Sequence, residues 1–271
     1  MTEPANQPLI SFIIPVFNRL DLTRDCLKSL EQTVKGHAWE AIIVDDCSTA
    51  GTAEFLASLP SSSYRVLRNE TKQSYAVSNN RAAATARGEF LCFLNNDIIL
   101  TPGWLEPMLI AFDRFPNVGF VGNVQRNPRT GRYEHMGMVF SNRQHLCCGR
   151  YFPFKPFRGY TSWQAVAAAC CLIRRSVFLE ADGFDESYVN GCEDMDLCLR
   201  LGQAGYKHYV ATDSVIYHYV SSSEGRRDFE QRNKLRFLEQ WGDTVRRTLT
   251  PRDRLLYGIN YVVRLLFRPG K

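Results

Sequence analysis

The sequence lacks the glycine-rich loops that two large classes of nucleotide-binding enzyme use to hold phosphate. Neither G-x-G-x-x-G nor G-x-x-x-x-G-K-[ST] occurs in the 271 residues, which argues against dinucleotide oxidoreductases and P-loop ATPases. The nine cysteines contain no C-x-x-C pair, and no apolar run reaches the roughly 18–20 residues that span a bilayer. We therefore expect neither a disulfide scaffold, nor a zinc ribbon, nor a membrane-spanning helix.

A strong excess of one charge sign is also missing. The 33 Lys and Arg against 28 Asp and Glu leave a net charge of +5, which is too small to predict a nucleic-acid partner. The first residues, MTEPANQPLI, show neither the basic nor the apolar segment of a secretory signal. Together with the cysteine usage, this predicts a cytoplasmic protein with free thiols.

Short apolar runs alternate with stretches of helical periodicity along most of the chain. The runs at 9–16, 41–44, 64–67, 89–94, 118–124 and 215–217 predict strands, and the stretches at 22–30, 52–59, 75–86, 105–115, 193–204 and 227–241 predict helices. Regular structure is also expected at 165–173. This alternation predicts an α/β fold with a mostly parallel central sheet covered on both faces. From 123 to about 164 the pattern breaks down, which predicts a loop-rich segment with a functional role.

Polar clusters follow three of the predicted strands. They are Phe17-Asn18-Arg19, Asp45-Asp46 and Asn95-Asn96-Asp97. In an open parallel sheet, ligands bind in the crevice outside the carboxyl ends of the strands, so these residues are candidates for one site. A divalent cation is the natural counter-charge for a diphosphate held without a glycine loop. The alternative is that Asp45 and Asp46 only cap the next turn.

A second acidic cluster opens the predicted helix at 193–204. Glu193, Asp194 and Asp196 fall within four residues, next to Gly191. The helix dipole favours acids in a first turn, which is a structural explanation for at least one of them, and it also keeps a general base ionised. His218 follows the last predicted strand and is the best placed of the five histidines for metal ligation or proton transfer.

The order and spacing of six sequence blocks resemble the family 2 glycosyltransferases, including bacterial surface-polysaccharide enzymes of the rhamnosyltransferase-like type. The blocks are FIIPVFNR, IIVDDCST, RAAATARGEFLCFLNND, PGWLE, CCLIRRSVFLEADGFDESYVNGCEDMDLCLRLGQAGY and VIYHYVSSSEGR. The resemblance implies a GT-A fold, a nucleotide-diphosphate sugar donor, and a Mn²⁺ or Mg²⁺ cofactor. It implies a glycan or lipid-linked glycan acceptor and no nucleic acid.

The same resemblance assigns the site residue by residue. The nucleotide-sugar pocket would comprise Pro15, Phe17, Asn18, Arg19, Asp45, Asp46, Asn80, Asn95 and Asn96. Asp97, in the position of the last acid of the family's D-x-D motif, and His218 would hold the metal. Asp194 would be the catalytic base of an inverting transfer, with Glu193 positioning the acceptor. Asn95 departs from the pattern, because it replaces the first acid of D-x-D.

Two other functions remain open from the sequence. A sugar nucleotidyltransferase should carry a glycine-rich basic loop near its first strand, and PVFNRLDLTRD has no glycine. A catalytically silent sugar- or nucleotide-binding scaffold would be free to lose its base, whereas Glu193, Asp194 and Asp97 are all present. Both are therefore weaker interpretations than an inverting glycosyltransferase.

The division of the chain follows from the same patterns. We expect a GT-A domain over 1–245, with a donor-binding half at about 9–124 and an acceptor and catalytic half at about 125–245. In the latter, a set of arginines and aromatic residues either clamps the acceptor or packs the loop: Arg126, Arg129, Arg132, Arg143, Arg150, Tyr151, Phe152, Phe154, Phe157, Tyr160 and Trp163.

The basic, apolar tail at 246–271 is too short and too charged to span a membrane. It is either an interfacial helix on the cytoplasmic face of the inner membrane or an ordinary packing or dimerisation helix. The oligomeric state stays open.

Overall fold

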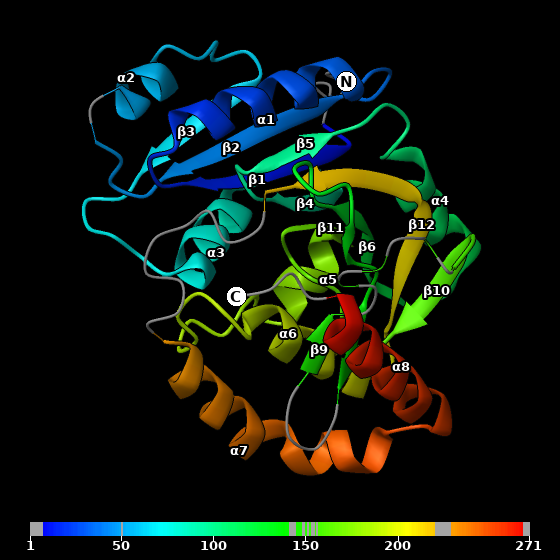
Figure 1. Cartoon of the computed structure of the whole chain (residues 1–271). Helices are drawn as coiled ribbons and strands as arrows, with labels where there is room; N and C mark the ends of the chain where they lie inside the picture. The colour runs from blue at the N-terminus through cyan, green and yellow to red at the C-terminus, as the bar shows by residue number, and fades with distance from the viewer. Residues whose placement is uncertain are drawn as a thin grey trace, which may run out of the picture.

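The computed structural model is an α/β sheet structure (Figure 1). It describes residues 8–49, 51–140, 145–147, 150, 152, 155, 157–219 and 229–267. The strands are β1 Ile10–Val16, β2 Trp39–Asp45, β3 Tyr64–Arg68, β4 Phe90–Leu94, β5 Ile98–Leu100, β6 Val118–Arg126, β7 Tyr133–His135, β8 Met138–Phe140, β9 His145–Cys147, β10 Tyr160–Trp163, β11 Cys170–Arg174 and β12 Lys207–His218. The helices are α1 Leu20–Thr33, α2 Thr52–Ala57, α3 Tyr75–Thr85, α4 Glu106–Arg114, α5 Arg175–Glu180, α6 Glu193–Gln203, α7 Glu230–Thr248 and α8 Pro251–Phe267.

The main sheet runs in the order β10-β12-β6-β11-β4-β1-β2-β3. Strands β4, β1, β2 and β3 are mutually parallel, and β12 is parallel to β6. Strand β11 is antiparallel to both of its neighbours, β4 and β6. The prediction of a mostly parallel sheet is therefore confirmed, with β11 as an antiparallel strand at its centre.

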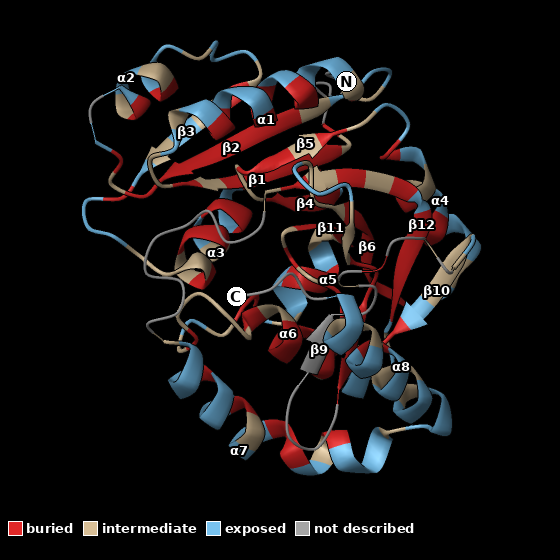
Figure 2. Ribbon diagram, viewed as in Figure 1, coloured by how far each residue is buried: buried red, intermediate tan, exposed pale blue. Residues whose placement is uncertain are grey.

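Strand β1 shows why this sheet is covered on both faces. Ile13 packs into a core with α3, α5, α6 and α7, whereas its neighbours Phe12 and Ile14 pack into a second core with α1 and α4. Successive side chains of a strand point to opposite faces, so a continuous apolar run requires two cores. Figure 2 shows the buried strands between these two helical layers.

The segment from 123 to 164 contains more regular structure than its sequence predicts. Strands β7, β8, β9 and β10 are three or four residues each. The sequence did not predict these strands, because runs this short show no periodicity of their own. They form by pairing with distant partners, as β10 pairs with β12 and β8 with β9.

Other boundaries also differ from the sequence-based expectation. Strand β11 begins at Cys170, within the regular stretch expected at 165–173, and β12 is 12 residues long rather than the three expected at 215–217. Helix α7 runs through residue 245, and the tail forms the separate helix α8. The seven cysteines whose side chains the structure describes are free, and five of them are buried, as expected for small apolar residues.

Candidate functional site

A left-handed turn joins β1 to α1. Asn18 and Arg19 have φ angles of 54° and 56°, a region that non-glycine residues occupy only when the surrounding structure holds them there. The Asn18 amide oxygen accepts a hydrogen bond from the Thr49 backbone N–H at 2.8 Å, and the Asn18 N–H donates to Ser48 Oγ at 2.9 Å. The ends of β1 and β2 are thereby fastened together.

The two aspartates at the end of β2 have different partners. Asp45 is 2% exposed, and it accepts a hydrogen bond from the Ser48 N–H at 2.8 Å and forms an ion pair with Arg68. The turn-capping interpretation therefore applies to Asp45. Asp46 Oδ1 accepts from Asn69 Nδ2 at 2.8 Å and from the Gln73 N–H at 2.7 Å, which joins β2 to the segment before α3.

The Asn95-Asn96-Asp97 cluster lies between β4 and β5. The Asn95 N–H donates to the Ala169 carbonyl at 2.8 Å, and Asn96 Nδ2 donates to Thr23 Oγ1 of α1 at 2.9 Å. Asp97 is 6% exposed. The motif is therefore held from both sides, and its acid is nearly enclosed by protein.

His218 lies beside Asp97 because β12 pairs with β5. In this antiparallel register His218 stands opposite Ile98, and its Nε2 is 3.2 Å from Asp97 Oδ1. Its other ring nitrogen, Nδ1, lies 2.8 Å from the Gln125 amide oxygen. The sheet register thus brings together two residues that are 121 positions apart in the sequence.

The chemistry of these three side chains suits a cation. An amide oxygen only accepts, so the contact with Gln125 favours a proton on Nδ1 of His218 and leaves Nε2 facing Asp97. A lone pair and a carboxylate oxygen at that distance repel unless a proton or a metal ion joins them. Imidazole and carboxylate ligands together suit Mn²⁺, and a hydrogen-bond acceptor behind a ligating histidine is typical of metal sites. The residues present therefore fit a divalent metal.

The acids at the start of α6 separate into two roles. Asp196 is fully buried and accepts hydrogen bonds from Trp241 Nε1 at 2.8 Å and Gln240 Nε2 at 3.0 Å, so it holds α7 against α6. Glu193 is also buried, and its carboxylate accepts from the Gly191 N–H at 2.6 Å. Asp196 is thus the structural member of the cluster.

Asp194 is joined to the Asn95 motif through one short stretch of main chain. Its Oδ2 accepts from the Ala168 N–H at 3.1 Å, while the next residue, Ala169, accepts from the Asn95 N–H. The Tyr75 hydroxyl donates to the Ala168 carbonyl at 2.8 Å. Because both clusters are bound to the main chain of adjacent residues, the proposed base and the proposed metal-binding motif share one region of the molecule.

Three neighbours of this region were not predicted from the sequence. Gln125 supports His218, and no local sequence signal singled it out, because β6 also contains the polar residues Asn123 and Arg126. His135 Nε2 accepts from the N–H groups of Gly137 and Ala167 at 3.2 and 3.3 Å, and burial lowers its pKa to about 3. Burial also raises the pKa of Glu134, against the opposite influence of nearby cations.

The remaining predicted pocket residues are Pro15, Phe17 and Asn80. Pro15 is opposite Val44 in the pairing of β1 and β2, and the Lys72 ammonium lies 3.9 Å from the centre of the Phe17 ring. The Asn80 side chain donates to the Phe184 carbonyl at 2.8 Å and accepts from the Phe184 N–H at 2.9 Å. Asn80 therefore fastens α3 to the segment before α6.

The predicted acceptor residues have mixed surroundings. Phe152 and Trp163 are buried in the core, which supports packing for these two. Arg126 lies 5.3 Å from the centre of the Tyr133 ring and Arg129 5.8 Å from that of Tyr219, the residue after His218. Arg143, Tyr151 and Phe154 lie outside the described residues.

Comparison with known families identifies the family of the chain. The profile of glycosyl transferase family 2 matches residues 11–181. The chain belongs to glycosyl transferase family 2. The matched residues contain the turn after β1, both strand-end acid clusters and β11, whereas Asp194 of α6 and His218 of β12 lie beyond the match.

This family 2 glycosyltransferase is similar in sequence to proteins of several bacteria. The chain is 34% identical over 237 residues to the uncharacterized protein y4gI of Sinorhizobium fredii, and 31% identical over 228 residues to the O-antigen biosynthesis protein RfbC of Myxococcus xanthus. These alignments cover 82% and 80% of this chain but only 25% and 18% of the relatives. It is 27% identical to the N-acetylglucosaminyl-diphospho-decaprenol L-rhamnosyltransferase of Mycobacterium tuberculosis, over 68% of each chain.

Solved structures of low sequence identity share the fold. GalNAc-T7, solved with UDP, GalNAc and Mn²⁺, superposes with a TM-score of 0.68 at 16% identity, over 88% of this chain and 49% of that one. The mannosyltransferase PcManGT of Pyrobaculum calidifontis, solved with GDP-Man and Mn²⁺, gives 0.63 at 17% identity, over 94% and 70%. The fold of this family 2 chain is therefore the GT-A fold, as expected.

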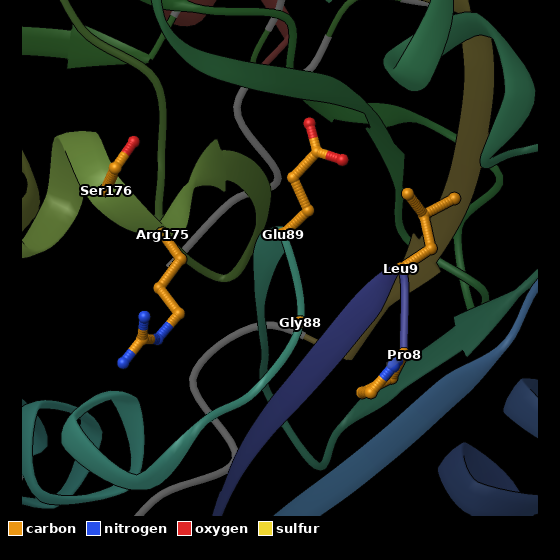
Figure 3. Close-up of a pocket in the computed structure, with 6 residues that line it drawn as sticks. All are labelled: Pro8, Leu9, Gly88, Glu89, Arg175 and Ser176. Atoms are coloured by element: carbon orange, nitrogen blue, oxygen red, sulfur yellow. The ribbon is translucent and has the colours of Figure 1, made fainter. Parts of the chain in front are cut away.

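The pocket in Figure 3 lies apart from the site of this family 2 glycosyltransferase. It is lined by Pro8, Leu9, Gly88, Glu89, Arg175 and Ser176. Leu9 and Glu89 immediately precede β1 and β4, so the pocket is at the amino ends of strands whose carboxyl ends carry the acid clusters. None of the predicted site residues lines it.

Proposed function

We propose that this chain transfers a sugar from a nucleotide-diphosphate sugar to a hydroxyl group of a glycan or lipid-linked glycan, with inversion at the anomeric carbon. The observation that carries the proposal is a pair of hydrogen bonds to adjacent residues: Asp194 accepts from the Ala168 N–H, and the Asn95 N–H donates to the Ala169 carbonyl. A base and a metal-binding acid in one region are what a single displacement from a diphosphate requires.

The donor would bind along the carboxyl ends of β1, β2 and β4. Asp45, already bound to Arg68, would hold the turn that carries Asp46, and Asp46 would contact the base or ribose. The turn at 17–19 and the Asn95–Asn96 pair would form the remaining walls. Asn80 would not contact the donor itself but would position the segment that leads to α6.

Asp97 and His218 would hold Mn²⁺ or Mg²⁺, with Gln125 fixing the imidazole. Bound there, the metal supplies a positive charge that offsets the negative charge of the departing nucleoside diphosphate. In the described part of the chain, no three His, Cys, Asp or Glu side chains gather as a complete metal site. The protein would thus supply two of these ligands and leave positions open for the donor.

Asp194 would remove the proton from the attacking hydroxyl. A sugar hydroxyl is a poor nucleophile at neutral pH, and a positioned base contributes roughly 10²–10⁴-fold to the rate. The N-terminus of α6 favours the ionised carboxylate, and the hydrogen bond from Ala168 orients it. One displacement by the activated hydroxyl, on the face opposite the leaving group, inverts the configuration.

The substitution Asp194→Asn tests this assignment. We expect turnover of the donor to fall about 10²–10⁴-fold, while the affinity for nucleotide, measured by calorimetry, stays close to the wild-type value. Asp213→Asn is the matched control, because Asp213 is an exposed acid of β12 that pairs with Lys155. Retained turnover in Asp194→Asn would remove Asp194 as the base, and a wild-type chain that binds nucleotide without turnover would favour the scaffold interpretation.

A further inference from the structure

Helix α8 directs an apolar stripe outwards. Leu255, Ile259, Val262 and Leu266 are spaced by four, three and four residues, which places them on one face of the helix. They are 65%, 44%, 52% and 71% exposed. The opposite face packs against β8 and β9 and contains Asn260, which is 3% exposed. The inward side also carries Leu256, Tyr257 and Val263, which are partly buried against the core, so α8 is apolar on its outward face as well as on its inward one.

This stripe stands apart from the rest of the surface. Of the eleven exposed large hydrophobic side chains in the described ranges, seven belong to α8. The other four are scattered over β3, α4, α5 and α7 as Val66, Ile110, Leu179 and Leu235. Scattered apolar side chains are ordinary on a protein surface, whereas a contiguous patch marks a surface that another apolar phase covers.

Positive charge is concentrated in the same segment. Residues 246–271 contain seven Lys or Arg and one acid, Asp253, a net charge of 7 − 1 = +6. The whole chain has a net charge of +5, so the preceding 245 residues sum to −1. Arg246, Arg247 and Arg254 are exposed at the end of α7 and the start of α8. An apolar stripe with a basic border complements an anionic lipid surface.

The C-terminal end of α8 lies near the proposed metal-binding edge. Arg132, in the turn between β6 and β7, donates to the Phe267 carbonyl at 2.6 Å. In the same turn, Arg129 lies over Tyr219, whose N–H donates to the Asp97 carbonyl. Figure 1 shows α8 in red beside β9, on the part of the molecule distant from α1 and α2. A surface that covers α8 would therefore lie near the proposed metal-binding edge.

We propose that the outward face of α8 binds an anionic membrane surface, with the apolar stripe inserted at the headgroup boundary and the arginines against lipid phosphate. In the described residues no helix is long and apolar enough to cross a bilayer, so α8 would lie in the plane of the interface. A second copy of this chain is the less favourable occupant, because a symmetric contact through this face would bring two segments of +6 together.

Sedimentation with lipid vesicles tests the proposal without requiring turnover. Full-length protein should bind vesicles of phosphatidylcholine with phosphatidylglycerol, bind phosphatidylcholine alone far more weakly, and lose binding as salt rises. The double variant Leu255→Gln/Leu266→Gln should bind the anionic vesicles at least about tenfold more weakly. Its matched control is Ile110→Gln/Leu235→Gln, which removes two exposed apolar side chains outside α8 and should bind as the wild type does.

Two results would overturn the proposal. One is equal binding of the α8 variant and the wild type to anionic vesicles. The other is a wild-type dimer in sedimentation velocity that the α8 variant converts to a monomer, with no vesicle binding by either. The latter result would assign the face to a second copy. Nucleotide affinity of the α8 variant, unchanged from wild type, confirms that the variant is folded.

Discussion

Gln125 offers the sharpest test of how the proposed metal site is built. Its amide oxygen is 2.8 Å from His218 Nδ1, and this contact leaves Nε2 facing Asp97. The residue is 2% exposed, so water cannot easily replace it. The substitution Gln125→Met keeps the approximate volume of the side chain and removes the strong acceptor.

The size of the effect follows from the loss of one outer-shell hydrogen bond. Such losses typically weaken metal affinity by 10–100-fold, or about 1.4–2.7 kcal/mol at about 1.4 kcal/mol per tenfold change. Without the acceptor, the proton on the His218 ring is no longer confined to Nδ1, and a proton on Nε2 blocks ligation. We therefore expect Mn²⁺ to bind Gln125→Met at least tenfold more weakly.

The assay is electron paramagnetic resonance of free Mn²⁺, titrated in the presence of a nucleoside diphosphate. Gln125→Glu is the matched control, because it keeps an acceptor oxygen for Nδ1 and should retain affinity. Thermal unfolding of each variant shows whether the buried substitution has disturbed the fold. If Gln125→Met binds Mn²⁺ as tightly as the wild type while Asp97→Ala does not, the proposal that Gln125 supports the metal site is refuted.

Three predictions concern stability. Asp196→Ala should lower the free energy of unfolding by roughly 3–5 kcal/mol, because buried donors lose a charged acceptor, as urea denaturation will measure. Burial lowers the pKa of His135 to about 3 and that of His208 to about 4, so the unfolded chain binds more protons below about pH 6.5. The free energy of unfolding should therefore fall by about 2–3 kcal/mol from pH 7 to about pH 5.5. Gly137→Ala should cost at least about 2 kcal/mol, because φ is +113° and the added Cβ would lie 2.3 Å from the Trp163 ring.

Each of these predictions has a control that would expose an error. Asp243→Ala removes an exposed acid of α7 and should change stability by less than about 0.5 kcal/mol. The variant His135→Asn should reduce the pH slope by about half, and an unchanged slope would contradict the protonation argument. Gly36→Ala meets no atom within 4 Å at a φ of +81°. It should therefore cost less than Gly137→Ala, and equal costs would contradict the packing argument.

The donor-side half of the fold could be predicted well from the sequence. Strands β1, β2 and β4 are mostly buried apolar runs, and the helices between them have one apolar face, so local patterns and final structure agree. The placement of Asp45 and Asn95 at the same edge of the sheet, on strands β2 and β4 that flank β1, followed from parallel topology alone. These features need no knowledge of distant contacts.

The other half could not be predicted to the same extent. Strand β5 is three residues long and exists because β12 pairs with it, a contact across more than a hundred positions. The same pairing places His218 against Asp97. The residues were named from the resemblance, but their separation of 3.2 Å and the support from Gln125 depend on strand register, which no local pattern encodes.

The acid cluster shows a similar division. Three acids at the start of a helix predicted a functional cluster with at least one structural member, yet only the packing of α7 identifies Asp196 as that member. Trp241 and Gln240 provide the donors, and neither has a sequence signal for this contact. The choice of a membrane-binding role for α8 likewise could not be made from the sequence, because it depends on which face of the helix packs against β8 and β9.

The measurement that tests the central claim most directly is thermal stability with UDP, dTDP, GDP and CDP, each with and without Mn²⁺ or Mg²⁺, for the wild type and Asp97→Ala. A ligand at 100 times its Kd stabilises by about 2.7 kcal/mol, which gives a readable shift. The account predicts a shift with one nucleotide that requires the metal and is lost in Asp97→Ala. A shift of equal size without metal, or in Asp97→Ala, would contradict it.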